Sequence, residues 1–224
     1  MRTVAIISQK GGAGKTTLAV HLAAAATAAG RAALILDTDP QASAMMWAEW
    51  RGLAGFGEPD VIDCGAPGLL SKKIAQAADL GGELVVIDTP PHADIMAREA
   101  CKAADLVLIP CRPKAFDLAA VQTTAGLVKA SGKPAFVVFT AGPQRAPATY
   151  KEATELLAGL GLDVAPVMLT ERAVYHHSAG AGKTALEVEP EGKAADEVNA
   201  LWKWTSAQVN MLTPSRVSRK RRAA

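Results

Sequence analysis

A turn made almost entirely of glycine stands near the start of the chain, between a strand-like segment at residues 3–8, with an apolar run at 4–7, and an alanine-rich segment at 16–29. The apolar run is typical of a buried strand, and the alanine-rich segment favours a helix. Glycine takes up tight left-handed turns without strain, so the turn predicts a strand that leads directly into a helix. Such a strand needs neighbours, which the rest of the chain has to provide.

Further apolar runs alternate with longer segments rich in Ala, Leu, Lys and Glu. The runs are residues 32–36, 84–87, 106–109 and 135–139, and the longer segments are 42–50, 69–78, 93–103, 116–130, 149–160 and 194–211. Runs that are apolar on both faces fit the buried strands of a parallel sheet. The alternation predicts an α/β fold with a doubly wound, mostly parallel sheet flanked by helices. We expect one domain over residues 1–212 and a basic, disordered tail over 213–224.

Composition excludes several classes of protein. Half of the 224 residues are hydrophobic, which is enough for a sizeable core. The sequence contains no run of about 18 apolar residues, so we expect no transmembrane helix. The first residues lack the pattern of a signal peptide. The three cysteines, Cys64, Cys101 and Cys111, have no paired spacing. They indicate a reducing compartment, and we expect a cytoplasmic protein.

Charge is divided unevenly, although the formal net charge is only +2. Five basic residues and no acidic one lie in the last nine positions: Arg216, Arg219, Lys220, Arg221 and Arg222. Without them, 19 basic residues remain against 22 acidic ones. An acidic body with a basic tail is a first indication about partners.

The glycine turn belongs to a longer motif with a specific chemistry. The motif comprises Gly11, Gly12, Ala13, Gly14, Lys15, Thr16 and Thr17. Its glycines let successive N–H groups and the helix N-terminus point at the oxygens of a bound phosphate. Lys15 can reach the β- and γ-phosphates of a nucleotide, and the Thr16 hydroxyl suits Mg²⁺. An ordinary glycine-rich turn is the alternative, but strand, glycines, Lys, Thr and helix all agree.

The loop departs from the usual spacing, in which a glycine is followed by four residues and then Gly-Lys-Thr. Gln9 takes the place of that glycine, and a second lysine, Lys10, stands directly before Gly11. Lys10 need not contact the nucleotide of its own chain and can reach the phosphate of a partner subunit. The alternative is a solvated surface lysine.

Three aspartates follow apolar runs. Asp37 and Asp39 come after residues 32–36, and Asp88 comes after residues 84–87. Ligands gather at the carboxyl ends of parallel strands, so these carboxylates are expected at the nucleotide site. Asp37 or Asp39 can orient an attacking water or hold a water of the Mg²⁺ shell, unless they only cap the next helix. Asp88 has the form of a Walker B carboxylate, which binds the magnesium shell.

Together, residues 10–17, 37–41 and 88–91 resemble the deviant Walker A ATPases of the ParA/MinD group. The similarity spans residues 3 to about 208 and is greatest to the small plasmid-partition ATPases of the ParA family, the ParF-like branch. Residues 109–117 resemble the proline-containing segment of that family, and 169–175 resemble its late Arg…Tyr segment. The resemblance implies a P-loop NTPase fold of the deviant Walker A type.

The resemblance also implies catalytic roles. Lys10 would contact the nucleotide across an ATP-sandwich homodimer. Lys15 would hold phosphate, and Asp39 would orient the hydrolytic water.

Metal and adenosine contacts are implied in the same way. Thr16 would hold Mg²⁺, with Asp37 nearby, and Asp88 would act through the Mg²⁺ shell. The proline segment, with Pro110 and Pro113, would lie near the adenosine.

In proteins of this group, the ATP-bound dimer binds DNA without sequence preference, and a ParB-like centromere-binding adaptor stimulates hydrolysis. The resemblance therefore implies a nucleoid-associated ATPase that uses ATP/ADP and Mg²⁺ to partition plasmid or chromosomal DNA, with weak activity when alone. Positioning of a protein cluster is the alternative, because it would use the same motor residues.

DNA binding without sequence preference requires basic residues that reach phosphates. Arg172, Lys193, Lys203 and the five basic tail residues are the candidates. A solvated helix face is the alternative for the first three, and a disordered solubilising end is the alternative for the tail. MinD relatives bind membranes through a C-terminal amphipathic helix. After Pro214 only Val217 is sizeable and apolar, so we expect no membrane partner.

Other functions stay open. A metabolic ATP-dependent enzyme of the dethiobiotin-synthetase type would need a small-molecule pocket, for which we see no motif. Cys101 and Cys111 suggest an alternative, an iron–sulfur ATPase resembling nitrogenase iron protein. These cysteines are not surrounded by the glycine-rich sequence that flanks the cluster ligands of that family. Residues 178–184 imitate a phosphate loop without an apolar strand before it. We expect them to form a loop before the final helix.

Overall fold

The computed structural model describes residues 1–92 and 94–211. Seven strands in this part of the chain form one sheet, and every pairing between them is parallel. They are β1 (Arg2–Ile6), β2 (Ala33–Asp37), β3 (Asp60–Asp63), β4 (Leu84–Asp88), β5 (Leu106–Cys111), β6 (Ala135–Gly142) and β7 (Asp163–Thr170). Their order across the sheet is β3-β2-β4-β1-β5-β6-β7. The predicted doubly wound parallel sheet is confirmed.

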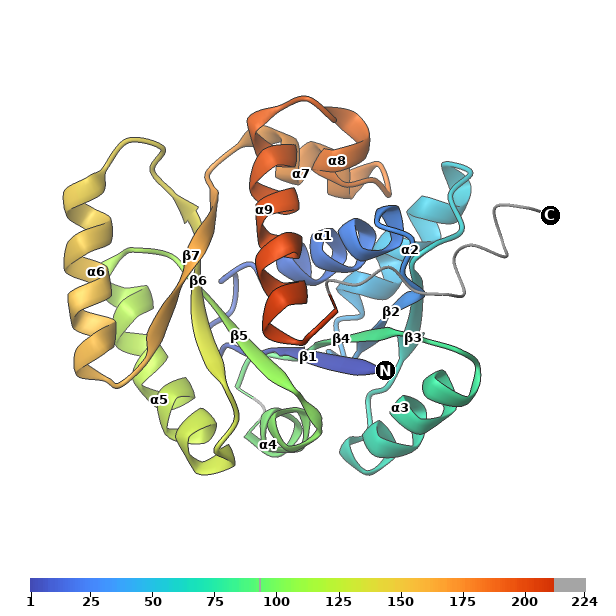
Figure 1. Cartoon of the computed structure of the whole chain (residues 1–224), viewed down its shortest axis with the longest axis horizontal. Helices are drawn as coiled ribbons and strands as arrows, with labels where there is room; N and C mark the ends of the chain where they lie inside the picture. Colours follow the sequence, from blue (N-terminus) through green and yellow to red (C-terminus); the bar gives the residue numbers. More distant parts are fainter. Residues whose placement is uncertain (93, 212–224) are drawn as a thin grey trace.

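Helices cover both faces of this sheet (Figure 1). One face carries α1 (Lys15–Ala28), α2 (Ser43–Leu53), α7 (Ala173–Gly180), α8 (Ala185–Val188) and α9 (Lys193–Gln208). The other face carries α3 (Leu70–Asp79), which follows a short 3₁₀ turn at Pro67–Leu69, and then α4 (Asp94–Ala103), α5 (Ala115–Ser131) and α6 (Pro147–Gly159).

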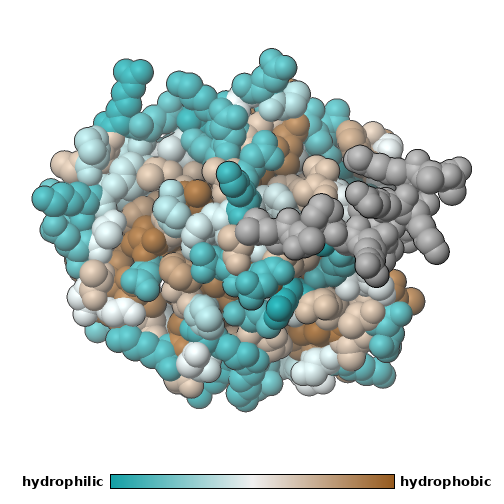
Figure 2. All heavy atoms as spheres, viewed as in Figure 1, coloured by the Kyte–Doolittle hydropathy of each residue, from teal (hydrophilic) through white to brown (hydrophobic). Residues whose placement is uncertain are grey.

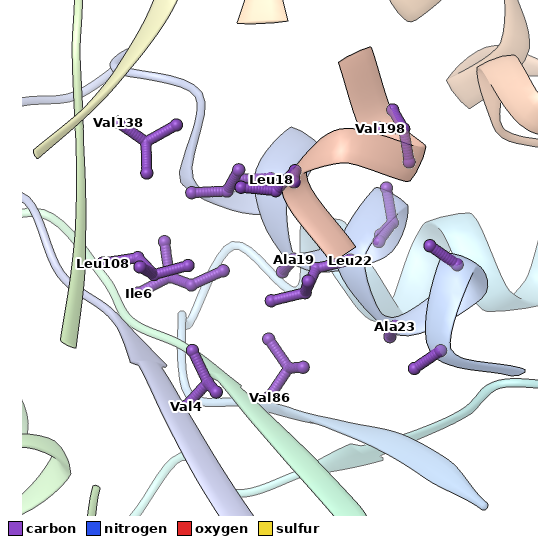
Figure 3. Close-up of a cluster of buried hydrophobic side chains, with 14 of the residues drawn as sticks. Val4, Ile6, Leu18, Ala19, Leu22, Ala23, Val86, Leu108, Val138 and Val198 are labelled. Carbon is purple, nitrogen blue, oxygen red and sulfur yellow. The ribbon is translucent and has the colours of Figure 1, made fainter. Parts of the chain in front are cut away.

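Two hydrophobic cores result, because successive side chains of a strand point to opposite faces of the sheet. In β1, Val4 and Ile6 belong to the core under α1 and α9, whereas Ala5 belongs to the opposite core. Figure 3 shows Val4 and Ile6 with their strand neighbours opposite Leu18 and other side chains of α1. Helix α1 is apolar on nearly all sides and lies between the sheet and α9, so its alanines permit close packing on both sides.

The sequence reasoning missed the two edge strands, β3 and β7. An edge strand has one neighbour and is partly solvated, so its sequence need not be a continuous apolar run. β3 begins and ends with exposed aspartates, and β7 contains Pro166, which a strand tolerates at an edge. The five internal strands, which are buried on both faces, were the ones that the apolar runs predicted.

Residues 178–184, which imitate a phosphate loop, serve to pack the helices. The first three residues are the end of α7, and the expected loop is found at 181–184, where Thr184 caps α8 in a capping box with Glu187. Gly182 has a φ of +65° and lies against the backbone of Trp50 and Arg51 in α2. The Arg51 guanidinium binds the Gly182 carbonyl at 3.1 Å and Glu187 at 2.7 Å.

Replacing Gly182 by alanine is expected to lower the free energy of unfolding by about 3 kcal/mol, because a Cβ would overlap the α2 backbone in a left-handed conformation. Gly180→Ala is the matched control, because a Cβ there meets no atom within 4 Å and alanine favours the α7 helix. Urea unfolding of both variants measures the difference. Equal effects at the two positions would contradict the packing role of Gly182.

The surface of the described part of the chain is mixed in character. On the face in Figure 2, hydrophobic surface is broken into separate patches among hydrophilic side chains. No helix within residues 1–92 and 94–211 is long and apolar enough to cross a membrane.

Candidate nucleotide-binding site

The glycine-rich turn joins β1 to α1 and adopts the expected left-handed conformations. Gly12 has a φ of 70° and Gly14 a φ of 94°. Two side chains from distant elements hold the turn from outside: Arg112 donates to the Gly12 carbonyl at 2.6 Å, and Thr140 donates to the Ala13 carbonyl at 2.7 Å. A trans peptide places N–H and C=O on opposite sides. The N–H groups of the same two peptides, which belong to Ala13 and Gly14, therefore point away from Arg112 and Thr140. An anion-binding loop requires such consecutive N–H groups.

The side chain of Lys15 is buried at the base of this turn. Its Nζ atom donates to the Lys10 carbonyl at 3.2 Å. Burial lowers the pKa of Lys15, against the opposing effect of the Asp88 and Asp39 carboxylates. A positive charge held in this position is available to the oxygens of a phosphate that enters the loop.

Thr16 and Asp88 form a hydrogen-bonded pair of oxygen ligands. The Thr16 hydroxyl donates to one carboxylate oxygen of Asp88 at 2.7 Å, and the other oxygen, Oδ1, is buried without a partner. Burial raises the pKa of Asp88 to about 7, and Asp37 adds to this effect, whereas the Thr16 hydrogen bond opposes it. An unpartnered buried carboxylate oxygen beside a hydroxyl fits a hard cation such as Mg²⁺. These two residues can hold that ion next to the phosphate loop.

Asp37 and Asp39 have different surroundings. Asp37 is buried and accepts the backbone N–H groups of Ala44 and Met45 at 3.0 Å, so it caps α2. Its second oxygen accepts the N–H of Asp39 at 3.1 Å. The structure thus favours the helix-cap alternative for Asp37 over metal binding. Asp39 lines the cavity, and one of its carboxylate oxygens accepts the N–H of Gln41 at 2.9 Å. The carboxylate can still accept a hydrogen bond from a water.

Lys10 lies outside the cavity that Lys15 lines. Its ammonium pairs with Asp117 of α5 at 3.5 Å, and it borders a separate hollow with Gln9 and Thr123. Its side chain remains 36% exposed. Within a single chain, the Lys10 ammonium therefore pairs with Asp117 and does not line the cavity of its own phosphate loop.

A cavity of about 460 Å³ extends from the phosphate loop, which is within the range for small-molecule sites. Its other walls come from the ends of β5, β6 and β7, from the segments that follow β2 and β4, and from the starts of α2 and α7. The residues beyond the loop are Asp39, Gln41, Ser43, Pro91, Arg112, Lys114, Thr140, Ala141, Leu169, Thr170, Glu171, Arg172, Tyr175 and His176. The carboxyl ends of parallel strands thus meet at one site.

Pro110 and Pro113 are not among the residues that line this cavity. Both are buried, and Pro110 lies within β5. Arg112 and Lys114, from the same segment, line the cavity in their place. The sequence located the right segment but not its side-chain directions, which the end of β5 decides.

The expected DNA-binding residues separate into three groups. Arg172 is a correction, because its guanidinium pairs with Glu197 at 2.8 Å on the cavity wall and is 18% exposed. Lys193 and Lys203 are exposed on α9. Arg216, Arg219, Lys220, Arg221 and Arg222 lie outside the described residues.

His21 connects the phosphate-loop helix to the opposite wall of the cavity, and sequence reasoning missed it. It is buried and accepts the N–H of Ala185 at Nε2, at 3.0 Å. Nδ1 therefore carries the proton and donates to the Thr17 carbonyl at 2.8 Å. The ring also packs edge-on against Tyr175, with centroids 5.1 Å apart. Burial lowers the pKa of His21 to about 4.

His21 and Asp88 are expected to make opposite contributions to acid stability in the nucleotide- and magnesium-free protein. The pKa of His21 is lowered on folding, so its contribution is complete above pH 6.5 and is lost on acidification. The pKa of Asp88 is raised to about 7, so its contribution grows as pH falls from 7 toward 4. Each contribution changes by about 2 kcal/mol between pH 7 and pH 5.

Urea unfolding at pH 7 and pH 5 separates these contributions. Relative to the parent, His21→Gln should gain about 2 kcal/mol on acidification, and Asp88→Asn should lose a similar amount. Each variant serves as the control for the other, because the expected changes differ in sign. Parental pH dependence in both variants would show that neither residue titrates as described.

These features define a class of protein: a nucleotide-binding domain with a phosphate loop at the carboxyl edge of a doubly wound parallel sheet. Residues 4–183 match the CobQ/CobB/MinD/ParA nucleotide binding domain family. The chain belongs to this family, and within it to the ATPases of the ParA/MinD type.

Curated relatives match over different lengths. A "Maintenance of carboxysome distribution protein A" from Gloeobacter kilaueensis is 37% identical over 216 residues, which cover 90% of this chain and 96% of that protein. Its namesake from Halothiobacillus neapolitanus is 29% identical over 89% of this chain and 94% of its own. A ParA protein from Rhizobium radiobacter is 35% identical over 124 residues, about half of each chain (52% and 51%).

Solved structures of low sequence identity share the fold. The cell division ATPase MinD of Pyrococcus furiosus has a TM-score of 0.74 at 21% identity, over 92% of this chain and 98% of that one. Apo McdA of Cyanothece has a TM-score of 0.70 at 17% identity, over 90% and 99%. A McdA variant with an aspartate replaced by alanine, in complex with ATP, has a TM-score of 0.69 at 18% identity, over 96% and 99%.

Proposed function

We propose that this ATPase is a dimerising switch that positions a cargo by binding DNA only when it holds ATP. The observation that carries the proposal is the separation of two lysines. Lys15 serves the phosphate loop of its own chain, whereas Lys10 lies outside that cavity. A lysine so close to the loop, yet directed elsewhere, suits an ATP-sandwich homodimer in which each Lys10 reaches the partner's nucleotide.

Hydrolysis follows from the residues around the loop. The amide groups fixed by Arg112 and Thr140, together with Lys15, hold the β- and γ-phosphates. Thr16 and Asp88 hold the magnesium ion, which when bound neutralises phosphate charge. Asp39 orients a water toward the γ-phosphorus, and ADP and phosphate are the products.

The cargo favoured by the comparisons is a protein assembly. Two relatives that match this chain over about nine tenths of its length are named for the maintenance of carboxysome distribution. Plasmid or chromosomal DNA is the second candidate, because the ParA and Soj relatives match about half of the chain. In both cases an adaptor, ParB-like in the second, would couple the cargo to the ATPase and stimulate hydrolysis on the nucleoid.

DNA binding is assigned to the exposed Lys193 and Lys203 of α9 and to the basic tail residues. DNA affinity depends on the number of phosphates that a protein neutralises. A dimer doubles that number, which makes the affinity sensitive to nucleotide state and to salt.

Co-sedimentation with random-sequence DNA tests this function. The full chain with ATP and Mg²⁺ should bind DNA, and the chain with ADP should bind it weakly, with a difference that shrinks as salt increases. Lys10→Ala should lose ATP-dependent binding while each chain still binds nucleotide, and Lys72→Ala, at an exposed lysine of α3, is the matched control. Equal DNA binding with ATP and ADP would reject the switch. Removal of residues 216–224 measures the contribution of the tail.

Cells that lack the protein distinguish the two cargoes. If fluorescently marked protein assemblies cluster in these cells while plasmids are still inherited stably, a protein cargo is supported. Plasmid loss with evenly spaced assemblies would support the second candidate.

A further inference from the structure

Five hydrogen bonds converge on one carboxylate outside the cavity, that of Glu197 in α9. Its Oε1 atom accepts the Thr170 hydroxyl at 2.7 Å and the Arg172 guanidinium at 2.8 and 3.1 Å. Its Oε2 atom accepts the Tyr175 hydroxyl at 2.8 Å and the Thr170 N–H at 3.0 Å. An ionised carboxylate offers about four lone-pair sites, so these donors saturate Glu197.

All three partners of Glu197 line the cavity, but Glu197 itself does not. They lie on one short segment, which comprises the end of β7 and the start of α7. Burial raises the pKa of Glu197, but the hydrogen bonds from Arg172, Thr170 and Tyr175 outweigh it, and the net pKa is lowered. The carboxylate therefore remains charged and keeps this segment in place at neutral pH.

The same wall is fixed from a second side. The Tyr175 ring packs against His21, which binds the Thr17 carbonyl in the first turn of α1. The segment is thus held between α9 and the helix that begins at the phosphate loop.

The wall is suited to the part of a nucleotide that the phosphate loop does not hold. The loop offers backbone amides and Lys15 to phosphates, whereas Leu169 and Tyr175 add apolar and aromatic surface to the cavity. A nucleoside needs such surface together with a few fixed polar groups. Thr170 and Arg172 are polar groups of this kind.

We propose that Glu197 is a positioning residue that holds the Thr170–Tyr175 wall in the shape that receives the nucleoside, and so sets nucleotide affinity without touching the nucleotide. The inference rests on the proposed ATPase site. It predicts that loss of Glu197 lowers the affinity for nucleotides and not the affinity for a ligand made of phosphate alone. Such a ligand occupies the loop and does not contact this wall.

The full chain is titrated with Mg²⁺ and either ADP or inorganic tripolyphosphate. Glu197→Gln replaces an acceptor oxygen by an NH₂ group, which leaves a donor facing donors. ADP affinity should fall by about 10- to 100-fold, while tripolyphosphate affinity stays within about threefold of the parent. Asp196→Asn is the matched control, because it removes one exposed carboxylate from the same turn of α9. It should change neither affinity.

Tyr175→Phe is the second variant, in case Glu197→Gln does not fold. It removes one hydrogen bond to Glu197 and keeps the ring on His21, so it should weaken ADP selectively and by less. Unchanged ADP affinity, or an equal loss of ADP and tripolyphosphate affinity with a lower melting temperature, would overturn the proposal. Failure of the ATPase site itself is distinguishable, because Lys15→Ala would then leave both affinities at parental values.

Discussion

Lys15→Ala is expected to abolish productive nucleotide binding, with ATP and ADP affinities reduced about 100-fold and hydrolysis lost. The ammonium is buried beside the phosphate loop and has one hydrogen bond, to the Lys10 carbonyl. In the nucleotide complex it would form charge-assisted bonds to phosphate, which contribute about 3 kcal/mol together. Calorimetric titration with ADP and ATP at fixed Mg²⁺ measures the loss.

The fold of the Lys15→Ala protein should remain intact. Burial lowers the pKa of Lys15 and outweighs the nearby Asp88 and Asp39 carboxylates, so we expect its charge to add no net stability to the folded protein. Removal of this ammonium therefore should not reduce the free energy of unfolding without nucleotide. Lys72→Ala, on the exposed side of α3, controls for the loss of one positive charge. Parental affinity and turnover in Lys15→Ala would refute the phosphate-loop assignment.

Asp39→Ala should slow hydrolysis by about 100-fold or more and leave ATP binding and ATP-induced dimerisation largely intact. Asp39 lines the cavity and has spare acceptor capacity, which suits a residue that orients water. Single-turnover hydrolysis and analytical ultracentrifugation with ATP measure the two properties separately. Hydrolysis at the parental rate would exclude the water-orienting role.

Asp37→Ala provides the contrast to Asp39→Ala. Asp37 caps α2 through the N–H groups of Ala44 and Met45, so its loss should appear mainly in the free energy of unfolding, by about 1–2 kcal/mol. If Asp37→Ala were stable and selectively slow in hydrolysis, the roles of the two aspartates would have to be exchanged.

Local sequence predicted much of this fold, for a physical reason. A strand that is buried on both faces must be apolar throughout, and a phosphate loop needs glycines at positions such as Gly12 and Gly14, where φ is positive. These demands act on neighbouring residues, so they can be read without knowledge of the fold. The edge strands β3 and β7 were not predicted, because a strand that is partly exposed to solvent need not be apolar throughout.

Side-chain roles were less predictable than the motifs that contain them. Asp37 and Asp39 are two residues apart at the end of one strand, yet one caps a helix and the other lines the cavity. Arg172 is basic, as a DNA-contacting residue would be. Glu197, 25 residues further along the chain, nevertheless holds it on the cavity wall. Neither difference is visible in the local pattern.

The sequence by itself determined the phosphate loop, its partner Asp88 and the doubly wound sheet, because backbone conformation and burial on both faces constrain short stretches of chain. Tertiary structure alone decided how the rest of the site is assembled. Arg112 and Thr140 orient the loop from 100 and 127 residues away, and α9 anchors the far wall through Glu197. Hydrogen bonds between distant elements depend on where the sheet brings the strand ends together, and no local pattern records that placement.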